Sequence, residues 1–170
     1  MHSNTAWPQR SAGMVPLLPG GTVKKKTIIM IAAVLAVAAS LILVRMAENR
    51  DTEDLLSRVD RFSVPPGWAQ EDDVVRPVRY LCFDTNPCPS IYRSWNAGKE
   101  IAPTDLAAMV SKSGFEMKVD GSCTRKPRDI GPTTVCSSSG NDGQYQYLLN
   151  VRSPGPGQPD LIILNVSPQQ

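Results

Sequence analysis

The most apolar part of the chain lies near its N-terminus, where eighteen residues without a charge separate Lys26 from Arg45. An α-helix rises about 1.5 Å per residue, so this segment would reach about 27 Å, close to the roughly 30 Å hydrocarbon core of a bilayer. The pattern therefore predicts a transmembrane helix over residues 27–45. Because Lys24, Lys25 and Lys26 precede it, the positive-inside rule predicts a cytoplasmic N-terminus and an extracytoplasmic C-terminal domain at the cell membrane.

A cleaved signal peptide is the alternative interpretation of the same segment. Ala36-Val37-Ala38 has the small-x-small pattern of a cleavage site. Against cleavage, 26 residues precede the apolar run, and the run continues past this site through Leu41-Ile42-Leu43-Val44. We favour a retained anchor. Under either interpretation, the residues from 46 onward lie outside the cytoplasm.

The segments on either side of the apolar run have different patterns. Residues 1–26 combine prolines and glycines with no periodicity, which predicts a disordered cytoplasmic tail. Residues 46–63 predict a juxtamembrane helical stalk, because apolar side chains recur on one helix face. That apolar stripe favours packing on the folded domain over a dimer contact, since sustained heptads are absent. The stripe consists of Leu55, Leu56, Val59 and Phe62.

Residues 64–170 have the pattern of a folded α+β domain, which Pro65-Pro66-Gly67 opens. A helix is predicted over 102–114, with Thr104 as its N-cap and Gly114 as its C-cap. Alternating apolar and polar residues, interrupted by the turn sequence of residues 140–143, predict strands. The predicted strands are 74–83, 115–119, 133–139, 145–151 and 160–166. The order of a strand, a helix and then an antiparallel meander indicates an α+β fold.

Charge is divided unevenly along the chain, although the formal net charge is only +2. The part up to Arg45 has five basic residues and no acidic ones. The part from Met46 onward has 13 basic and 16 acidic residues, a net charge of −3. The basic excess therefore lies beside the apolar run, where it determines membrane topology. We expect no nucleic acid among the partners.

All four cysteines, Cys82, Cys88, Cys123 and Cys136, follow the apolar segment. An even number in an exported domain predicts two disulfides. Of the three pairings, Cys82–Cys88 with Cys123–Cys136 is favoured, because the first closes a proline-containing loop and the second joins neighbouring strands. Zinc is the competing interpretation, but the spacing lacks the CxxC pairs of zinc sites.

The outer domain lacks the residues that most catalytic motifs require. The only histidine, His2, lies in the predicted cytoplasmic tail, which removes histidine-dependent nucleophiles and histidine-bound metals from the domain. Phosphate-binding and serine-hydrolase motifs are also absent, and we expect no cofactor. Carboxylates are the remaining catalytic candidates, since a pair facing across a cleft can hydrolyse glycosides. These candidates are Glu71, Asp72, Asp73, Asp84 and Asp105.

Aromatic and arginine side chains near the first cysteine pair form a candidate binding surface. Arginine and aromatic groups can stack on a sugar or a peptide. In a chain with 6% aromatic residues, the tryptophans are also candidates for the core. The candidate surface consists of Trp68, Arg79, Tyr92, Arg93 and Trp95. The basic segment Thr124–Arg128 is a second candidate, for an anionic polymer or lipid, or a solvated loop.

Several short motifs resemble uncharacterised exported proteins of high-GC Gram-positive bacteria. They are VPPGW at residues 64–68, CPSIYRSW at 88–95, TDLAAMVSKSGF at 104–115, VDGSC at 119–123 and the later Cys136. Such proteins are short, membrane-anchored or secreted, and have paired cysteines in an α+β domain. The resemblance implies a bacterial envelope setting and implies no activity.

The sequence therefore predicts a single-pass membrane protein whose outer domain has two disulfides. The leading functional hypothesis is a non-catalytic domain that binds an envelope protein or a wall polymer. The alternatives are an envelope hydrolase that uses a carboxylate pair, and a purely structural membrane tether.

Overall fold

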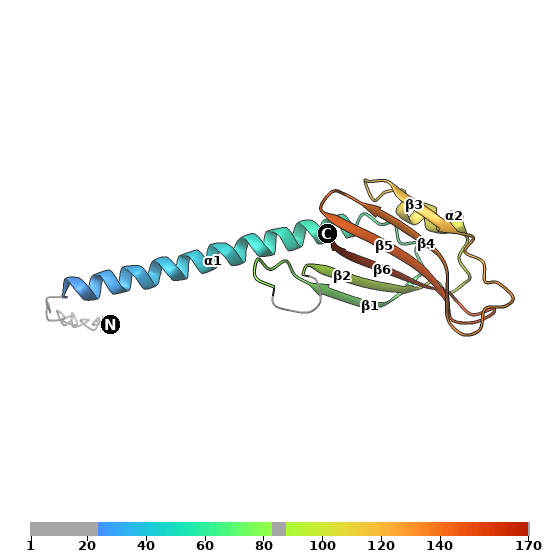
Figure 1. Cartoon of the computed structure of the whole chain (residues 1–170), viewed down its shortest axis with the longest axis horizontal. Helices are drawn as coiled ribbons and strands as arrows, with labels where there is room; N and C mark the ends of the chain where they lie inside the picture. Colours follow the sequence, from blue (N-terminus) through green and yellow to red (C-terminus); the bar gives the residue numbers. More distant parts are fainter. Residues whose placement is uncertain (1–23, 83–87, 170) are drawn as a thin grey trace, which may run out of the picture. The chain divides into compact units, whose positions relative to one another are not determined.

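The computed structural model describes residues 24–82 and 88–169, and these form an α+β fold with two helices and six strands (Figure 1). The predicted tail residues 1–23 lie outside the described part. The helices are α1 (Lys25–Val59) and α2 (Pro103–Val110). The strands are β1 (Ala69–Arg76), β2 (Ser90–Asn96), β3 (Met117–Gly121), β4 (Thr133–Asn141), β5 (Tyr145–Ser153) and β6 (Leu161–Pro168).

The chain divides into two compact units, residues 1–40 and residues 41–170. In the first unit, the described residues belong almost entirely to α1, and their side chains are exposed. α1 is long and apolar enough to cross a membrane, and it lies near the N-terminus, where a signal sequence has the same properties. The structure therefore contains one candidate membrane span among the described residues.

The second unit begins within α1 and includes the segment that the sequence predicts as a separate stalk. Leu55 and Val59 of α1, with Phe62 just beyond it, are buried in the core, and Leu56 packs against it. The apolar stripe thus packs on the domain. The helix continues through residue 45 without a break, so the candidate membrane span and the predicted stalk belong to one helix.

The six strands form one antiparallel sheet with the order β1-β2-β6-β5-β4-β3. The strands β3 to β6 are the predicted meander, and β6 then pairs with β2, so the β1–β2 hairpin extends the sheet. Buried residues alternate with exposed or partly buried ones along β5 and with partly buried ones along β6, as expected for a sheet with one covered face. The covered face packs against Leu106, Met109 and Val110 of α2 and against the α1 residues named above.

One predicted strand is misplaced and one strand was missed, and both errors concern the β1–β2 hairpin. β1 spans Ala69–Arg76 rather than residues 74–83, because Pro77 has no N–H for the sheet and the chain leaves it there. The acidic residues at 71–73 lie inside this edge strand. β2 was not predicted at all, since its polar residues and its inward Arg93 hide the alternation.

The limits of α2 also differ from the prediction. The N-cap is Ala102 rather than Thr104, because Pro103 occupies the first helical turn, where its fixed φ fits. The Asp105 carboxylate accepts the N–H of Ala102 at 3.1 Å. The helix ends at Val110, before the predicted Gly114. Just beyond it, the hydroxyl of Ser111 donates to the carbonyl of Ala108, a local bond that competes with further helix.

Both favoured disulfides are present, Cys82–Cys88 and Cys123–Cys136. The second bond links the residues just after β3 to β4, and both of its cysteines lie in the core. Gly121 ends β3 with a φ of +92°, and a Cβ there would lie 2.9 Å from the Val135 carbonyl oxygen. Glycine therefore allows the close approach of β3 and β4 beside this disulfide.

A part-buried carboxylate, Asp142, connects α1 to the β4–β5 turn. It accepts hydrogen bonds from Arg58 of α1 at 2.8 Å and from the Tyr147 hydroxyl at 2.7 Å. The backbone N–H groups of Gln144 and Tyr145 donate to its other oxygen at 3.0 and 2.8 Å. Burial opposes its ionisation, but the bond from Arg58, the backbone N–H of Tyr145 and the Tyr147 hydroxyl outweigh burial and lower the pKa of Asp142 to about 2.

We expect Asp142→Ala to lower the free energy of unfolding by about 2–4 kcal/mol, because Arg58 and Tyr147 then lose a part-buried partner. Asp54 is the matched control, since its carboxylate also binds Arg58 but is more than half exposed; Asp54→Ala should cost under about 0.5 kcal/mol. Denaturation of the full chain in detergent, followed by tryptophan fluorescence, measures both values. Equal losses in the two variants would contradict this assignment.

The same carboxylate predicts acid sensitivity. The folded pKa of Asp142, about 2, lies below its ordinary value of 3.8, so the unfolded chain takes up the proton more readily. Its contribution is therefore complete above about pH 5 and is lost as the pH falls through 4 toward 2. Unfolding curves between pH 6 and 2 should show this loss in the wild type and a smaller loss in Asp142→Ala.

The two disulfides should differ in their effect on stability. Cys123–Cys136 is buried and spans 13 residues, whereas Cys82–Cys88 spans 6. Replacing the first pair by serine should cost about 2–4 kcal/mol and the second pair less, because longer loops restrict the unfolded chain more. Without reductant, a maleimide should label no cysteine of the wild type. A larger cost for the Cys82–Cys88 pair would refute this ranking.

Candidate functional site

The core residues of α1 and α2 pack against one face of the sheet, and the candidate site lies on the opposite face. Strand pairing places the outward side chains in rows across the sheet, and they lie opposite the buried residues. One row consists of Lys118, Ser139, Leu148, Asn165, Tyr92 and Val74. The adjacent row includes Asn141, Gln146 and Ser167. We call this surface the open face.

The open face has an unusual composition on its three inner strands β4, β5 and β6. The polar side chains that β4, β5 and β6 place on the open face are almost all hydroxyls and amides. Arg152 is the only charged residue that these three strands contribute to it. A solvated surface more often has lysine and glutamate. The neutral polar residues are Thr134, Ser137, Ser139, Asn141, Gln146, Asn150, Asn165 and Ser167.

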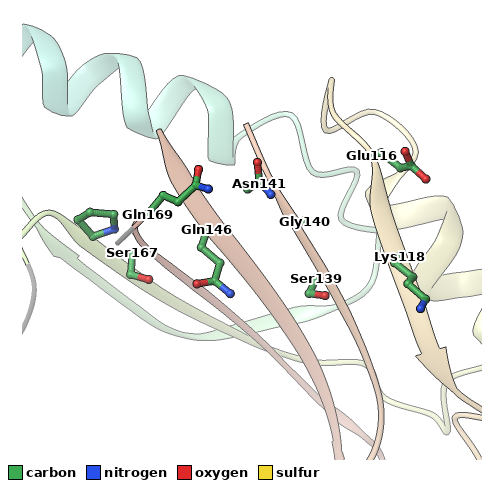
Figure 2. Close-up of a pocket in the computed structure, with 9 residues that line it drawn as sticks. Glu116, Lys118, Ser139, Gly140, Asn141, Gln146, Ser167 and Gln169 are labelled. Atoms are coloured by element: carbon green, nitrogen blue, oxygen red, sulfur yellow. The ribbon is translucent and has the colours of Figure 1, made fainter. Parts of the chain in front are cut away.

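One end of the open face is hollowed into a groove of about 790 Å³ (Figure 2). Figure 2 shows polar side chains from β4, β5 and the C-terminal part of the chain gathered there, with Glu116 and Lys118 at the β3 border. The groove is lined by Glu116, Lys118, Ser139, Gly140, Asn141, Gln146, Ser167, Pro168 and Gln169.

A glycine at position 140 allows the β3 side of the groove to form. A Cβ on Gly140 would lie 2.5 Å from the Glu116 carbonyl oxygen and 2.8 Å from the Met117 side chain. Neither distance is compatible with a larger residue. β3 can therefore pair closely with β4, and this pairing places Glu116 and Lys118 beside Ser139 and Asn141.

The chemistry of the groove is that of hydrogen bonding. Serine hydroxyls and asparagine or glutamine amides each both donate and accept, whereas the charges are one carboxylate and one ammonium group. Among residues 24–82 and 88–169, no three histidine, cysteine or acidic side chains are grouped so that they could hold a metal ion. The arrangement suits a neutral ligand that has hydroxyl or amide groups.

The aromatic members of the predicted binding surface lie in different places. Trp95 is 4% exposed and belongs to the core, and Trp68 packs against that core. Tyr92 is half-buried on the open face, between Val74 and Asn165. Because Tyr92 and Trp95 are separated by an odd number of strand positions, their side chains point to opposite faces.

The two predicted arginines hold elements of the fold together. Arg93, which points to the covered side, forms ion pairs with Asp60 at 2.6 Å and with Asp73 at 3.0 Å. Arg79 donates to Glu48 of α1 at 2.8 Å. The structure therefore does not unite the five predicted residues in one surface, and only Tyr92 contributes to the open face.

The candidate catalytic carboxylates are each bound to a neighbouring group, apart from Asp84, which lies outside the described residues. Glu71 accepts from the Asn96 amide, and Asp72 accepts from the buried Ser94 hydroxyl, both at 3.1 Å. Asp73 binds Arg93, as noted above. Asp105 caps α2, and its hydrogen bond from Lys99, together with the N–H of Ala102, lowers its pKa.

A second cavity, of about 260 Å³, lies at the opposite end of the strands, beside the buried Asp160. The Asp160 carboxylate accepts the N–H of Ile101 at 2.8 Å, and burial raises its pKa. Arg125, from the predicted basic patch, donates to the carbonyls of Ser153, Asp129 and Gly131. These bonds give the basic segment a structural role in joining two loops.

The chain matches no protein-family model, no curated protein and no solved structure. The open-face groove is therefore identified from its own geometry and chemistry. Sequence reasoning missed it, although the alternation in residues 133–139 and 145–151 already placed hydroxyls and amides on one side of two predicted strands. What the sequence did not reveal is that β3 and β6 bring further polar groups to the same side.

Proposed function

We propose that this protein is a membrane-anchored binding protein whose extracytoplasmic domain holds an uncharged stretch of a cell-envelope polymer, rich in hydroxyl and amide groups, on its open face. The observation that carries the proposal is the groove of about 790 Å³, lined mainly by hydroxyl and amide side chains from adjacent strands. An enzyme is not needed to explain these features, and we infer that binding is non-catalytic.

The anchored topology has three supports. The apolar helix is long enough to span a bilayer, three lysines adjoin its N-terminal end, and both disulfides follow it. Lysines before a span favour a cytoplasmic N-terminus, and disulfides favour an oxidising compartment for the domain. Residues 1–26 would then be cytoplasmic, and residues 46–170 would lie outside.

The polymer class follows from the groups on the open face. Sugar hydroxyls need partners that both donate and accept, which serine, asparagine and glutamine supply. Tyr92 and Leu148 lie in the row beside the groove and offer apolar contact for the faces of sugar rings. The groove is open rather than enclosed, so a chain could extend beyond it along the sheet.

Retention of the anchor predicts that the purified membrane protein still contains residues 1–45. Intact-mass measurement and N-terminal sequencing check this directly. A mature N-terminus near Ala39 would show instead that Ala36-Val37-Ala38 is cleaved and that the domain is released.

Binding through the groove predicts that Gln146→Ala weakens adsorption of the full chain to purified insoluble peptidoglycan by about 2- to 10-fold, the effect of losing one hydrogen bond. Gln146 is exposed at the groove, so the variant should fold normally. Gln158→Ala is the matched control, because Gln158 is an exposed glutamine in the loop between β5 and β6. Co-sedimentation at several protein concentrations measures both affinities.

Other outcomes of the same assay identify the alternatives. Release of soluble sugars by the wild type would support a hydrolase. Equal binding by both variants would place the binding surface elsewhere. If the wild type does not bind, cross-linking on intact cells decides between a protein partner and a structural tether, and only a tether forms dimers that survive deletion of the outer domain.

A further inference from the structure

The segment that follows β1 runs along α1 toward its apolar end. The N–H of Val78 donates to the Thr52 hydroxyl at 3.0 Å, and two residues later the N–H of Tyr80 donates to the Glu48 carboxylate at 3.1 Å. Thr52 and Glu48 are one turn apart, about 6 Å along the helix axis. The segment 78–81 therefore moves one helical turn closer to the apolar residues that precede Arg45.

Glu48 fixes this segment against the helix. It is 5% exposed, and its carboxylate binds Arg79 at 2.8 Å and Arg45 at 3.1 Å in addition to the N–H of Tyr80. That N–H, followed by Arg79 and Arg45, lowers the pKa of Glu48 despite the opposing effect of burial. The hydroxyl of Thr52 is also committed, since it donates to the Glu48 carbonyl at 2.7 Å.

The segment then exposes two large side chains to solvent. Leu81 is 76% exposed and Tyr80 is 58% exposed, although the Tyr80 hydroxyl bonds Asp51 at 3.2 Å. On α1, Leu41, Ile42, Leu43 and Val44 are exposed as well. Val44 precedes Glu48 by one helical turn, and Glu48 accepts the N–H of Tyr80, so the segment 78–81 lies beside the end of the apolar run.

We propose that Tyr80 and Leu81 contact the lipid at the outer surface of the membrane and hold the domain against the bilayer. This inference rests on the membrane anchor of the proposed function. If the hydrocarbon core ends near Val44, Glu48 lies about 6 Å beyond it. The polar headgroup layer is roughly 5–8 Å thick on each side, so the backbone of Tyr80 lies within it.

The residue types match this layer. Tyrosine is enriched at membrane–water interfaces because its ring is apolar and its hydroxyl is polar. Leu81 follows Tyr80 in the direction of the apolar residues, so it can reach the acyl-chain boundary. Arg79 and Arg45 lie on either side of Glu48, and the long stems of arginines allow their charges to remain in the headgroup layer.

The test uses the full chain reconstituted in vesicles made with or without lipids brominated in the upper acyl chain, since bromine quenches tryptophan on contact. One variant is Leu81→Trp. The matched control is Ile130→Trp, because Ile130 is 96% exposed in the β3–β4 connection at the opposite end of the strands. After the wild-type signal is subtracted, brominated lipid should lower the added emission of Leu81→Trp and leave that of Ile130→Trp unchanged.

Vesicle flotation separates this inference from the proposed function. If the chains float with the vesicles but neither variant is quenched, the contact of Tyr80 and Leu81 with lipid is refuted and the anchor stands. Quenching of both variants would also refute it, because the contact would not be specific to this end of the domain. If the chains do not float, the anchor itself is refuted, and the inference with it. Intact disulfides, checked by mass, confirm that both variants are folded.

Discussion

The hydrogen-bonded carboxylate of Asp142 is the interaction on which the rest of the domain depends. It joins three elements at once, because Arg58 comes from α1, Tyr147 from the core of β5, and the backbone N–H groups from the β4–β5 turn. Even a part-buried charge would oppose folding if it lacked donors. With four donors it fixes the rotation of α1, so that Leu55 and Val59 face the sheet.

This attachment explains how one helix can have two environments. Before Arg45, α1 is apolar on all sides and exposed, which is the pattern of a helix that lipid surrounds. After Glu48 it is amphipathic, and its apolar stripe is buried in the domain. Within the domain, two residues of α1 about ten positions apart make these attachments: Glu48 accepts a hydrogen bond from the segment after β1, and Arg58 donates one to Asp142 in the β4–β5 turn.

Local patterns predicted much of this fold, and non-local contacts account for what they missed. The periodicity of α1, the alternation in β3 to β6 and the spacing of Cys123 and Cys136 are properties of neighbouring residues, so the sequence revealed them. β2 was hidden because Arg93 points inward, where it pairs with Asp60 and Asp73.

The candidate site was less predictable than the fold. The aromatic and arginine residues near the first cysteine pair are close in sequence, but they alternate between the two faces of the sheet. The groove instead combines residues as distant as Glu116 and Ser167, which only the pairing of β3 to β6 brings together.

The arrangement of the sheet also explains why the open face can remain exposed without causing strands of separate molecules to pair. β1, at one edge, has acidic residues at 71–73 and a bulge between Gln70 and Asp72, and both features discourage pairing. β3, at the other edge, is only five residues long and carries Lys118 and Asp120. With both edges protected, the inner strands need no charged side chains to prevent edge-to-edge pairing with another molecule. Under the proposed function, the hydroxyls and amides of these strands make the contacts with the bound polymer.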